Sequence, residues 1–198
     1  MSGHIIILSA PSRCGKDTVV NALNADPALS FRHITTYTTR PKRREEVAGV
    51  HHHFVSEPVF QSMIQEGKLL EWARVRGAYF GTPIEPVERA LDAGENILLK
   101  IEVQGMKIVK QQFPHHVRTI FIKPQSIEDI RRRLRVPEFS PEQQRIRLAE
   151  ARREIRESVA YDYVVTNVPN KLRQLIAEVR AIVAKILSES SLDPADAA

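Results

Sequence analysis

Residues 9–18 constrain the fold of this chain more than any other stretch. They read SAPSRCGKDT, follow the largely apolar run at residues 4–8, and precede the apolar-rich residues 19–23. This order predicts a buried strand, a tight loop and the start of a helix. Successive backbone N–H groups, the positive end of the helix and the charge of Lys16 all favour an anion at such a loop. The stretch therefore predicts a phosphate-binding loop at the beginning of an α/β domain.

The loop departs from the pattern G-x-x-x-x-G-K-[ST] at two positions. Ala10 stands at the first glycine, and Asp17 stands where a hydroxyl normally binds Mg²⁺. An ordinary strand–turn–helix that carries one lysine is the alternative interpretation. The coincidence of a strand, Gly15-Lys16 and a helix favours the phosphate-binding loop.

Bulk composition fits one soluble globular domain. The 198 residues suffice for a single α/β core with insertions, and the hydrophobic and charged fractions, 42% and 27%, are ordinary. No apolar run approaches the ~20 residues of a membrane span, so no membrane partner is expected, and no secretory leader is visible. Cys14 is the only cysteine, which rules out an intrachain disulfide and makes a cytoplasmic setting the expectation. Nothing in the sequence gives the oligomeric state.

The net charge of +5 favours an anionic partner such as a nucleotide, a sugar phosphate or a nucleic acid. Four cations lie within residues 40–44, and nine arginines lie within residues 131–156, where glutamates are interleaved with them. A solvated helix face with ion pairs accounts for some of these arginines, and others could close over phosphates. No aromatic-rich stacking surface accompanies them, so nucleic-acid binding is not expected.

Apolar patterns predict alternating strands and helices. Strands are expected at residues 4–8, 31–39, 69–75, 96–102, 117–122 and 161–167, and helices at residues 16–24, 57–66, 83–94, 103–113, 126–134, 141–160 and 172–187. Such alternation predicts a parallel sheet with right-handed crossovers. The segment from about 31 to 82 interrupts the alternation and is expected to be an inserted lobe. Residues 189–198 lose the pattern and are predicted to be a frayed tail.

Two carboxylates and a histidine triplet are candidates for chemistry. Glu71 sits in an apolar strand, so it lies either at a rim in water or in a pocket as a hydrogen-bond acceptor. Glu102 follows a nearly continuous apolar strand, and active groups of open α/β sheets cluster at that end. His51-His52-His53 has no nearby cysteine, histidine or aspartate cluster to complete a metal site, so zinc is not expected.

Taken together, several separated motifs resemble the guanylate kinase family over residues 3–187. They are the loop at 9–18, TTRP at 38–41 with Arg43 and Glu46, FV at 54–55, LEWA at 70–73, GT at 81–82, VQG at 103–105, RLAEA at 147–151, and YDYVV at 161–165 with Asn167. The resemblance implies an α/β P-loop kinase fold, with a parallel sheet flanked by helices. It further implies a core at about 3–33 and 83–187, a monophosphate-binding lobe at about 34–82 and a small lid at about 135–147.

The resemblance also implies transfer of the γ-phosphoryl group of ATP to GMP. The ATP phosphates would contact Ala10, Pro11, Ser12, Arg13, Cys14, Gly15, Lys16, Asp17 and Thr18, with Asn167 near the adenine. Asp17 or Thr18 would reach Mg²⁺. The GMP site would comprise Thr36, Arg40, Arg43, Glu46, His52, Glu71, Phe80, Thr82 and Glu102. In it, Arg40 and Arg43 would bind the phosphate, and Glu71 would accept hydrogen bonds from guanine. Lys16, Arg40, Arg135 and Arg147 would act on the transferred group.

Several positions depart from the family pattern. Arg13 replaces a usual loop glycine, Lys100 replaces a usual acid, and His52 and Phe80 stand where tyrosines contact the acceptor phosphate. Two alternatives therefore stay open. One is a kinase of the same fold with another phosphorylated acceptor, such as ribose 1,5-bisphosphate, which Lys100 and His52 favour and Glu71 disfavours. The other is an inactive guanylate-kinase-like interaction module, which the intact Gly15-Lys16 disfavours.

Overall fold

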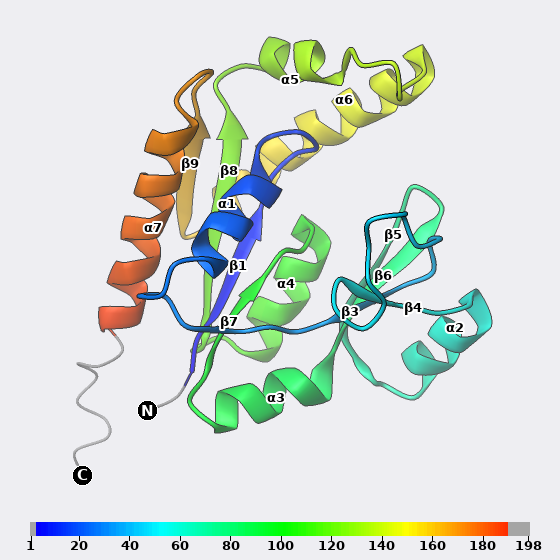
Figure 1. The fold of residues 1–198 in the computed structure, drawn as a ribbon, viewed down its shortest axis with the longest axis vertical. Coiled ribbons are helices and arrows are strands. Elements are labelled where there is room, and N and C mark those ends of the chain that lie inside the picture. The colour runs from blue at the N-terminus through cyan, green and yellow to red at the C-terminus, as the bar shows by residue number, and fades with distance from the viewer. Residues whose placement is uncertain (1–2, 190–198) are drawn as a thin grey trace.

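In the computed structural model, which describes residues 3–189, a five-stranded parallel sheet forms the centre of the chain (Figure 1). Its strand order is β2 (Phe31–Arg32), β7 (Asn96–Leu99), β1 (Ile5–Ser9), β8 (Val117–Pro124) and β9 (Tyr163–Asn167). All five residues of β1 are buried. A strand that is apolar on both faces needs cover on both, which fits its place in the middle of a parallel sheet.

Helices cover both faces of this sheet. Ile6 and Leu8 of β1 pack in one cluster with α1 (Lys16–Asn24) and α7 (Leu172–Glu189). Ile5 and Ile7 point the other way and pack with α3 (Ile84–Asp92) and α4 (Val103–Gln112). Each fully buried side chain of this size contributes about 1.5–3 kcal/mol to folding. The predicted parallel sheet flanked by helices is confirmed.

A second sheet of four strands stands beside the first (Figure 1). Its order is β4 (His52–Phe54), β3 (Thr36–Thr38), β6 (Ala78–Pro83) and β5 (Leu69–Val75), and α2 (Glu57–Gln65) packs on it. Phe60 of α2 is fully buried, and a Cβ at Gly81 would lie 2.9 Å from its ring. The absence of a side chain at Gly81 therefore lets α2 approach the sheet closely.

The single strand predicted at residues 31–39 is wrong. The chain pairs with β7 of the first sheet at Phe31–Arg32, leaves it, and pairs with His52–Phe54 and β6 of the second sheet at Thr36–Thr38. Between the two strands lie His33, Ile34 and Thr35, and Ile34 is buried in the same hydrophobic cluster as Ile5 and Ile7. The segment is thus a connection between the two sheets.

Two helices, α5 (Ile127–Leu134) and α6 (Pro141–Glu157), follow β8. Both begin with a capping box, Ser126 with Asp129 and Ser140 with Gln143. The predicted helix at 141–160 ends as a short 3₁₀ turn, Ser158–Ala160, and the last strand begins at Tyr163 rather than at residue 161. The final helix reaches Glu189, and the rest of the predicted tail lies outside the described residues. Among residues 3–189, no helix has the length and apolarity that a membrane crossing requires.

Candidate active site

The predicted phosphate-binding loop joins β1 to α1 as a tight turn. The Cys14 N–H donates to the Pro11 carbonyl at 3.1 Å, and Gly15 has a φ of +87° immediately before the helix. At the end of β9, Asn167 donates from Nδ2 to the Cys14 carbonyl at 2.9 Å. A Cβ at Gly15 would lie 3.0 Å from that same Nδ2, so the position suits glycine on both counts. Asn167 therefore holds the loop in place.

Two ion pairs tie the start of α1 to the residues that follow β7. Lys16 Nζ lies 3.4 Å from Glu102 Oε1, and Lys100 Nζ lies 2.7 Å from Asp17 Oδ1. The Asp17 side chain is largely exposed, although desolvation by its neighbours would by itself raise its pKa. The hydrogen bond and charge of Lys100, helped by Lys16 and Arg43, lower this pKa below its ordinary value. Asp17 is therefore ionised at neutral pH.

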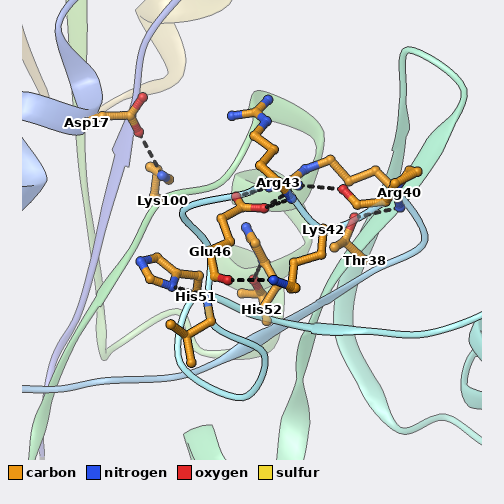
Figure 2. A network of polar contacts seen from close by, with 12 residues as sticks. Asp17, Thr38, Arg40, Lys42, Arg43, Glu46, His51, His52 and Lys100 are labelled. Atoms are coloured by element: carbon orange, nitrogen blue, oxygen red, sulfur yellow. Dashed lines mark hydrogen bonds and ion pairs between the residues drawn. The ribbon is translucent and has the colours of Figure 1, made fainter.

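The basic loop after β3 is folded around a single carboxylate (Figure 2). Arg40 donates to both oxygens of Glu46, at 2.7 and 2.5 Å, and the backbone N–H of Arg43 donates to Glu46 Oε2 at 2.9 Å. The Arg40 hydrogen bonds are the main reason that the pKa of Glu46 falls to about 2. The Arg40 guanidinium also lies 5.6 Å from the centre of the Phe54 ring. Glu46 thereby orients Arg40 and shapes the loop that carries Arg43.

Thr36, His52 and Phe80 lie together on the second sheet. The Thr36 hydroxyl is 2.7 Å from His52 Nδ1, and the His52 ring makes edge contacts with Phe54 and Phe80. Burial, followed by the charge of Arg40, lowers the pKa of His52, which keeps this imidazole neutral at pH 7. His52 is therefore a neutral hydrogen-bonding group beside the arginine loop.

Glu71 lies in the interior, so its placement at a rim in water is wrong. Glu71 is only 6% exposed. The fully buried Thr82 donates from its hydroxyl to Glu71 Oε1 at 2.6 Å. Burial raises the pKa of Glu71 to about 6, despite the hydrogen bonds from Thr82. The other oxygen faces Gly105 at the start of α4, where a Cβ would lie 2.5 Å from Oε2.

Helix α6 brings an arginine to the phosphate-binding loop. Arg147 donates from a terminal nitrogen to the Ser12 hydroxyl at 3.2 Å, and its guanidinium stacks on Phe139 at 3.9 Å from the ring centre. The Nε atom of Arg147 is buried and has no hydrogen-bond partner within the described part of the chain. Of the arginines predicted to act, Arg147 thus reaches the loop. Arg135 is exposed at the C-cap of α5 and takes no part in these contacts.

Sequence reasoning missed two arginines that hold this arrangement. Arg133 donates to the Arg13 carbonyl at 3.1 Å, which braces the loop from α5. Arg76, in the turn between β5 and β6, pairs with Glu150 of α6 at 2.8 Å and so joins the second sheet to α6. Helical spacing places Glu150 near the face of Arg147, but no sequence pattern could pair it with a residue 74 positions away.

A further carboxylate on α6 also escaped prediction. Burial, followed by the charge of Glu102, raises the pKa of Glu154 to about 8. Glu154 therefore stays mostly protonated at neutral pH beside the ionised groups of the site. The spacing of Glu150 and Glu154, four residues apart on one helix, was the available signal.

A Mg²⁺ ion at this site would need oxygen ligands. In residues 3–189 no group of three histidine, cysteine or acidic side chains forms a metal site. Mg²⁺ usually takes only one or two protein oxygens, with the rest from substrate phosphates and water. The carboxylate of Asp17 and the exposed hydroxyl of Thr18, at the start of α1, fit that requirement.

A cavity of about 750 Å³ lies elsewhere, between the connection from β2 to β3 and the start of α3. Tyr37, His53, Pro83 and Arg89 help to line it, and no residue of the phosphate-binding loop does. The charged groups described above lie outside it. Its size alone does not make it the active site.

Comparison with known proteins agrees with this geometry. The sequence model described as guanylate kinase matches residues 2–186. A guanylate kinase from Symbiobacterium thermophilum is 42% identical over 183 residues, which cover 91% of this chain and 84% of that one. A guanylate kinase from Chelativorans sp. is 39% identical, with coverage of 92% and 83%.

A solved guanylate kinase structure has a similar fold. The crystal structure of guanylate kinase from Anaplasma phagocytophilum superposes with a TM-score of 0.73 at 29% identity, covering 97% of this chain and 88% of that one. A family match over residues 2–186, relatives near 40% identity over 91–92% of this chain and a shared fold lead to one conclusion: this chain belongs to the guanylate kinase family.

Proposed function

We propose that this protein is an ATP-dependent nucleoside monophosphate kinase that converts ATP and GMP to ADP and GDP. The observation that carries the proposal is the buried carboxylate of Glu71 on β5, in the same sheet whose β3–β4 loop carries Arg40 and Arg43. Glu71 can accept hydrogen bonds from a base, and Arg40 and Arg43 can bind a phosphate. Such a pair of recognition groups suits GMP.

On the acceptor side, the second sheet and its loops act as the monophosphate-binding lobe, at about residues 34–82. Arg40 and Arg43 neutralise the acceptor phosphate, and Glu46 orients Arg40. Glu71 accepts from guanine, with Thr82 fixing its orientation and Thr36 and His52 lining the site. Glu102, paired with Lys16, stands between the two substrate sites.

On the donor side, the core at about 3–33 and 83–187 binds ATP. Backbone N–H groups within residues 12–18 and the Lys16 ammonium hold the β- and γ-phosphates. Among residues 3–189 the buried Nε of Arg147 has no hydrogen-bond partner, and a phosphate oxygen would satisfy this donor. Segment 135–147 is the proposed lid, and of the two arginines expected to act there, Arg147 is the one that reaches the loop. Asn167 supports the loop and borders the adenine site.

Asp17, with Thr18, is the proposed holder of Mg²⁺, which neutralises phosphate charge when it is bound. The protein's own residues then have a defined task. An oxygen of the GMP phosphate attacks the γ-phosphorus of ATP, the bond from that phosphorus to the β,γ-bridging oxygen breaks, and ADP leaves. The attacking oxygen is already anionic because the second pKa of a phosphate monoester is about 6. No general base is needed, so positioning and charge neutralisation provide the catalysis.

A cytoplasmic location is part of the proposal and rests on the single cysteine and the use of ATP. The partners are the two nucleotides. An ADP-release assay with GMP, dGMP, AMP, UMP and ribose 1,5-bisphosphate as acceptors tests the proposal. Turnover should be highest with GMP. Turnover on the sugar bisphosphate but not on GMP would favour the alternative acceptor, and no turnover with any acceptor would favour the interaction module.

A further inference from the structure

Lys100 is a second lysine at the mouth of the phosphate-binding loop. It follows β7 directly, and its ammonium lies 2.7 Å from the Asp17 carboxylate (Figure 2). Asp17 is the residue after the loop lysine, at the start of α1. The ammonium of Lys100 therefore stands within one residue of the group that holds the donor phosphates.

The two ion pairs between these segments have opposite polarity. Lys16 on α1 meets Glu102 after β7, whereas Lys100 after β7 meets Asp17 on α1. Lys16 is the more enclosed of the two lysines, because 15% of its side chain is exposed against 45% for Lys100. The site thus has one enclosed lysine and one open lysine.

Lys100 and Asp17 interact electrostatically with residues of the second sheet and its loop, which form the proposed acceptor side. Its charge acts on His52, which belongs to β4 of the second sheet. The charge of Arg43, from the basic loop of that sheet, acts on Asp17 in turn. Lys100 and Asp17 therefore lie where the loop and the second sheet approach each other.

Lys100 can exchange its Asp17 partner for another anion at little cost. The Asp17 side chain is 76% exposed, and only one carboxylate oxygen contacts Lys100. An ion pair in water with one contact is weak, whereas a phosphate dianion held among other cations is a stronger partner for an ammonium. No buried group has to be uncovered when Lys100 changes partner.

We propose that Lys100 binds the acceptor phosphate, and that Asp17 is a positioning residue that holds Lys100 at the loop until that phosphate arrives. This inference rests on the proposed function, since it assigns a further residue to the GMP site. The change involves hydrogen bonds and ion pairs only. When Lys100 moves to the phosphate, the Asp17 carboxylate becomes available to a cation.

Isothermal titration of GMP in EDTA tests the assignment without turnover or metal. The variants are Lys100→Gln, which removes the ammonium, and Asp17→Asn, which removes its partner. The matched control is Lys107→Gln on α4, because Lys107 also forms a 2.7 Å pair with an acidic side chain, Glu157. Lys100→Gln should weaken GMP binding about tenfold or more, the loss expected for one charge-assisted hydrogen bond. Asp17→Asn should leave binding unchanged or tighten it, and the control should match the wild type.

If the Lys100–Asp17 ion pair had only a structural role, both variants would change GMP binding equally, because both break the same contact. Equal loss of GMP affinity in Lys100→Gln and Asp17→Asn would overturn the assignment, and so would wild-type affinity in Lys100→Gln. ADP serves as the second ligand, and an equal loss for ADP and GMP would place Lys100 on the donor phosphates instead. Thermal melts of each variant check the fold. A wild-type protein that binds no GMP at all would reject the proposed function itself, which is a separate result.

Discussion

Replacing Glu71 with glutamine should stabilise the protein and impair it at the same time. Glu71 is 6% exposed, and burial raises its pKa from 4.5 to about 6. Each pKa unit corresponds to about 1.4 kcal/mol, so holding this side chain ionised in the folded state costs about 2 kcal/mol above pH 6. Glutamine has nearly the same shape, can still accept from Thr82, and carries no charge.

The sign of the pH dependence follows from the raised pKa. The folded state holds the Glu71 proton more tightly than the unfolded state does, so the stabilising effect of that proton is complete below pH 4.5 and is lost as pH rises through about 6. Glu71→Gln should therefore match the wild type near pH 4.5 and exceed it by about 2 kcal/mol at pH 8. Urea unfolding at both pH values measures this difference. Glu88→Gln, on an exposed position of α3, is the control.

The same substitution should weaken GMP binding. If the glutamine oxygen keeps the Thr82 hydrogen bond, its NH₂ group takes the place of Oε2. Under the proposed function, guanine donors would then meet another donor. Loss of a charge-assisted hydrogen bond costs about 1.5–3 kcal/mol, or about 10- to 150-fold in affinity. Titration calorimetry with GMP and with ATP separates the two substrates. An equal loss for both nucleotides, or a variant less stable than the wild type at pH 8, would refute the reasoning.

Three further experiments test other parts of the site. Lys16→Ala should lower kcat by about a hundredfold or more in the ADP-release assay while the circular dichroism spectrum and melting temperature stay near wild type; near-normal kcat would reject the role of the loop. Gly105→Ala would place a Cβ 2.5 Å from Glu71 Oε2, so KM for GMP should rise while KM for ATP does not, and unchanged GMP kinetics would show that Glu71 has room to move. The Arg76–Glu150 pair is partly exposed, so a double-mutant cycle of Arg76→Ala and Glu150→Ala in urea unfolding should give a coupling of about 0.2–1 kcal/mol; a coupling well above that range would mean that the pair does more than join two surfaces.

The central sheet could be predicted because its signals are local. Ile5, Ile6 and Ile7 are apolar on both faces, and that pattern requires a covered parallel strand. The loop and helix after β1 follow from Gly15-Lys16 in the same way. The residue pattern is similar at Phe31–Arg32 and Thr36–Thr38, although these two strands belong to different sheets. Only their partners distinguish them, because the first pairs with β7 and the second pairs with β4 and β6.

Contacts between distant segments could not be predicted. Glu71 could be recognised as unusual, but its burial depends on Thr82 and on Gly105, which belong to other elements. The Arg76–Glu150 pair depends on how the second sheet sits against α6. Arg135 and Arg147 looked equivalent in an arginine-rich segment, and packing on Phe139 distinguishes them.

The ion pairs of the site differ in how firmly each holds its cation, and this difference matters for phosphate binding. Arg40 is held by two hydrogen bonds to Glu46, and both side chains are mostly enclosed, so the guanidinium keeps one orientation before and after a phosphate arrives. A guanidinium has further N–H groups to offer, and therefore it can bind a phosphate without leaving its carboxylate. An ammonium with one close carboxylate contact in water, as in Lys100, can instead leave that carboxylate at little cost. Under the proposed function, the site combines a fixed arginine, which sets where the acceptor phosphate lies, with an exchangeable lysine, which leaves Asp17 when that phosphate arrives.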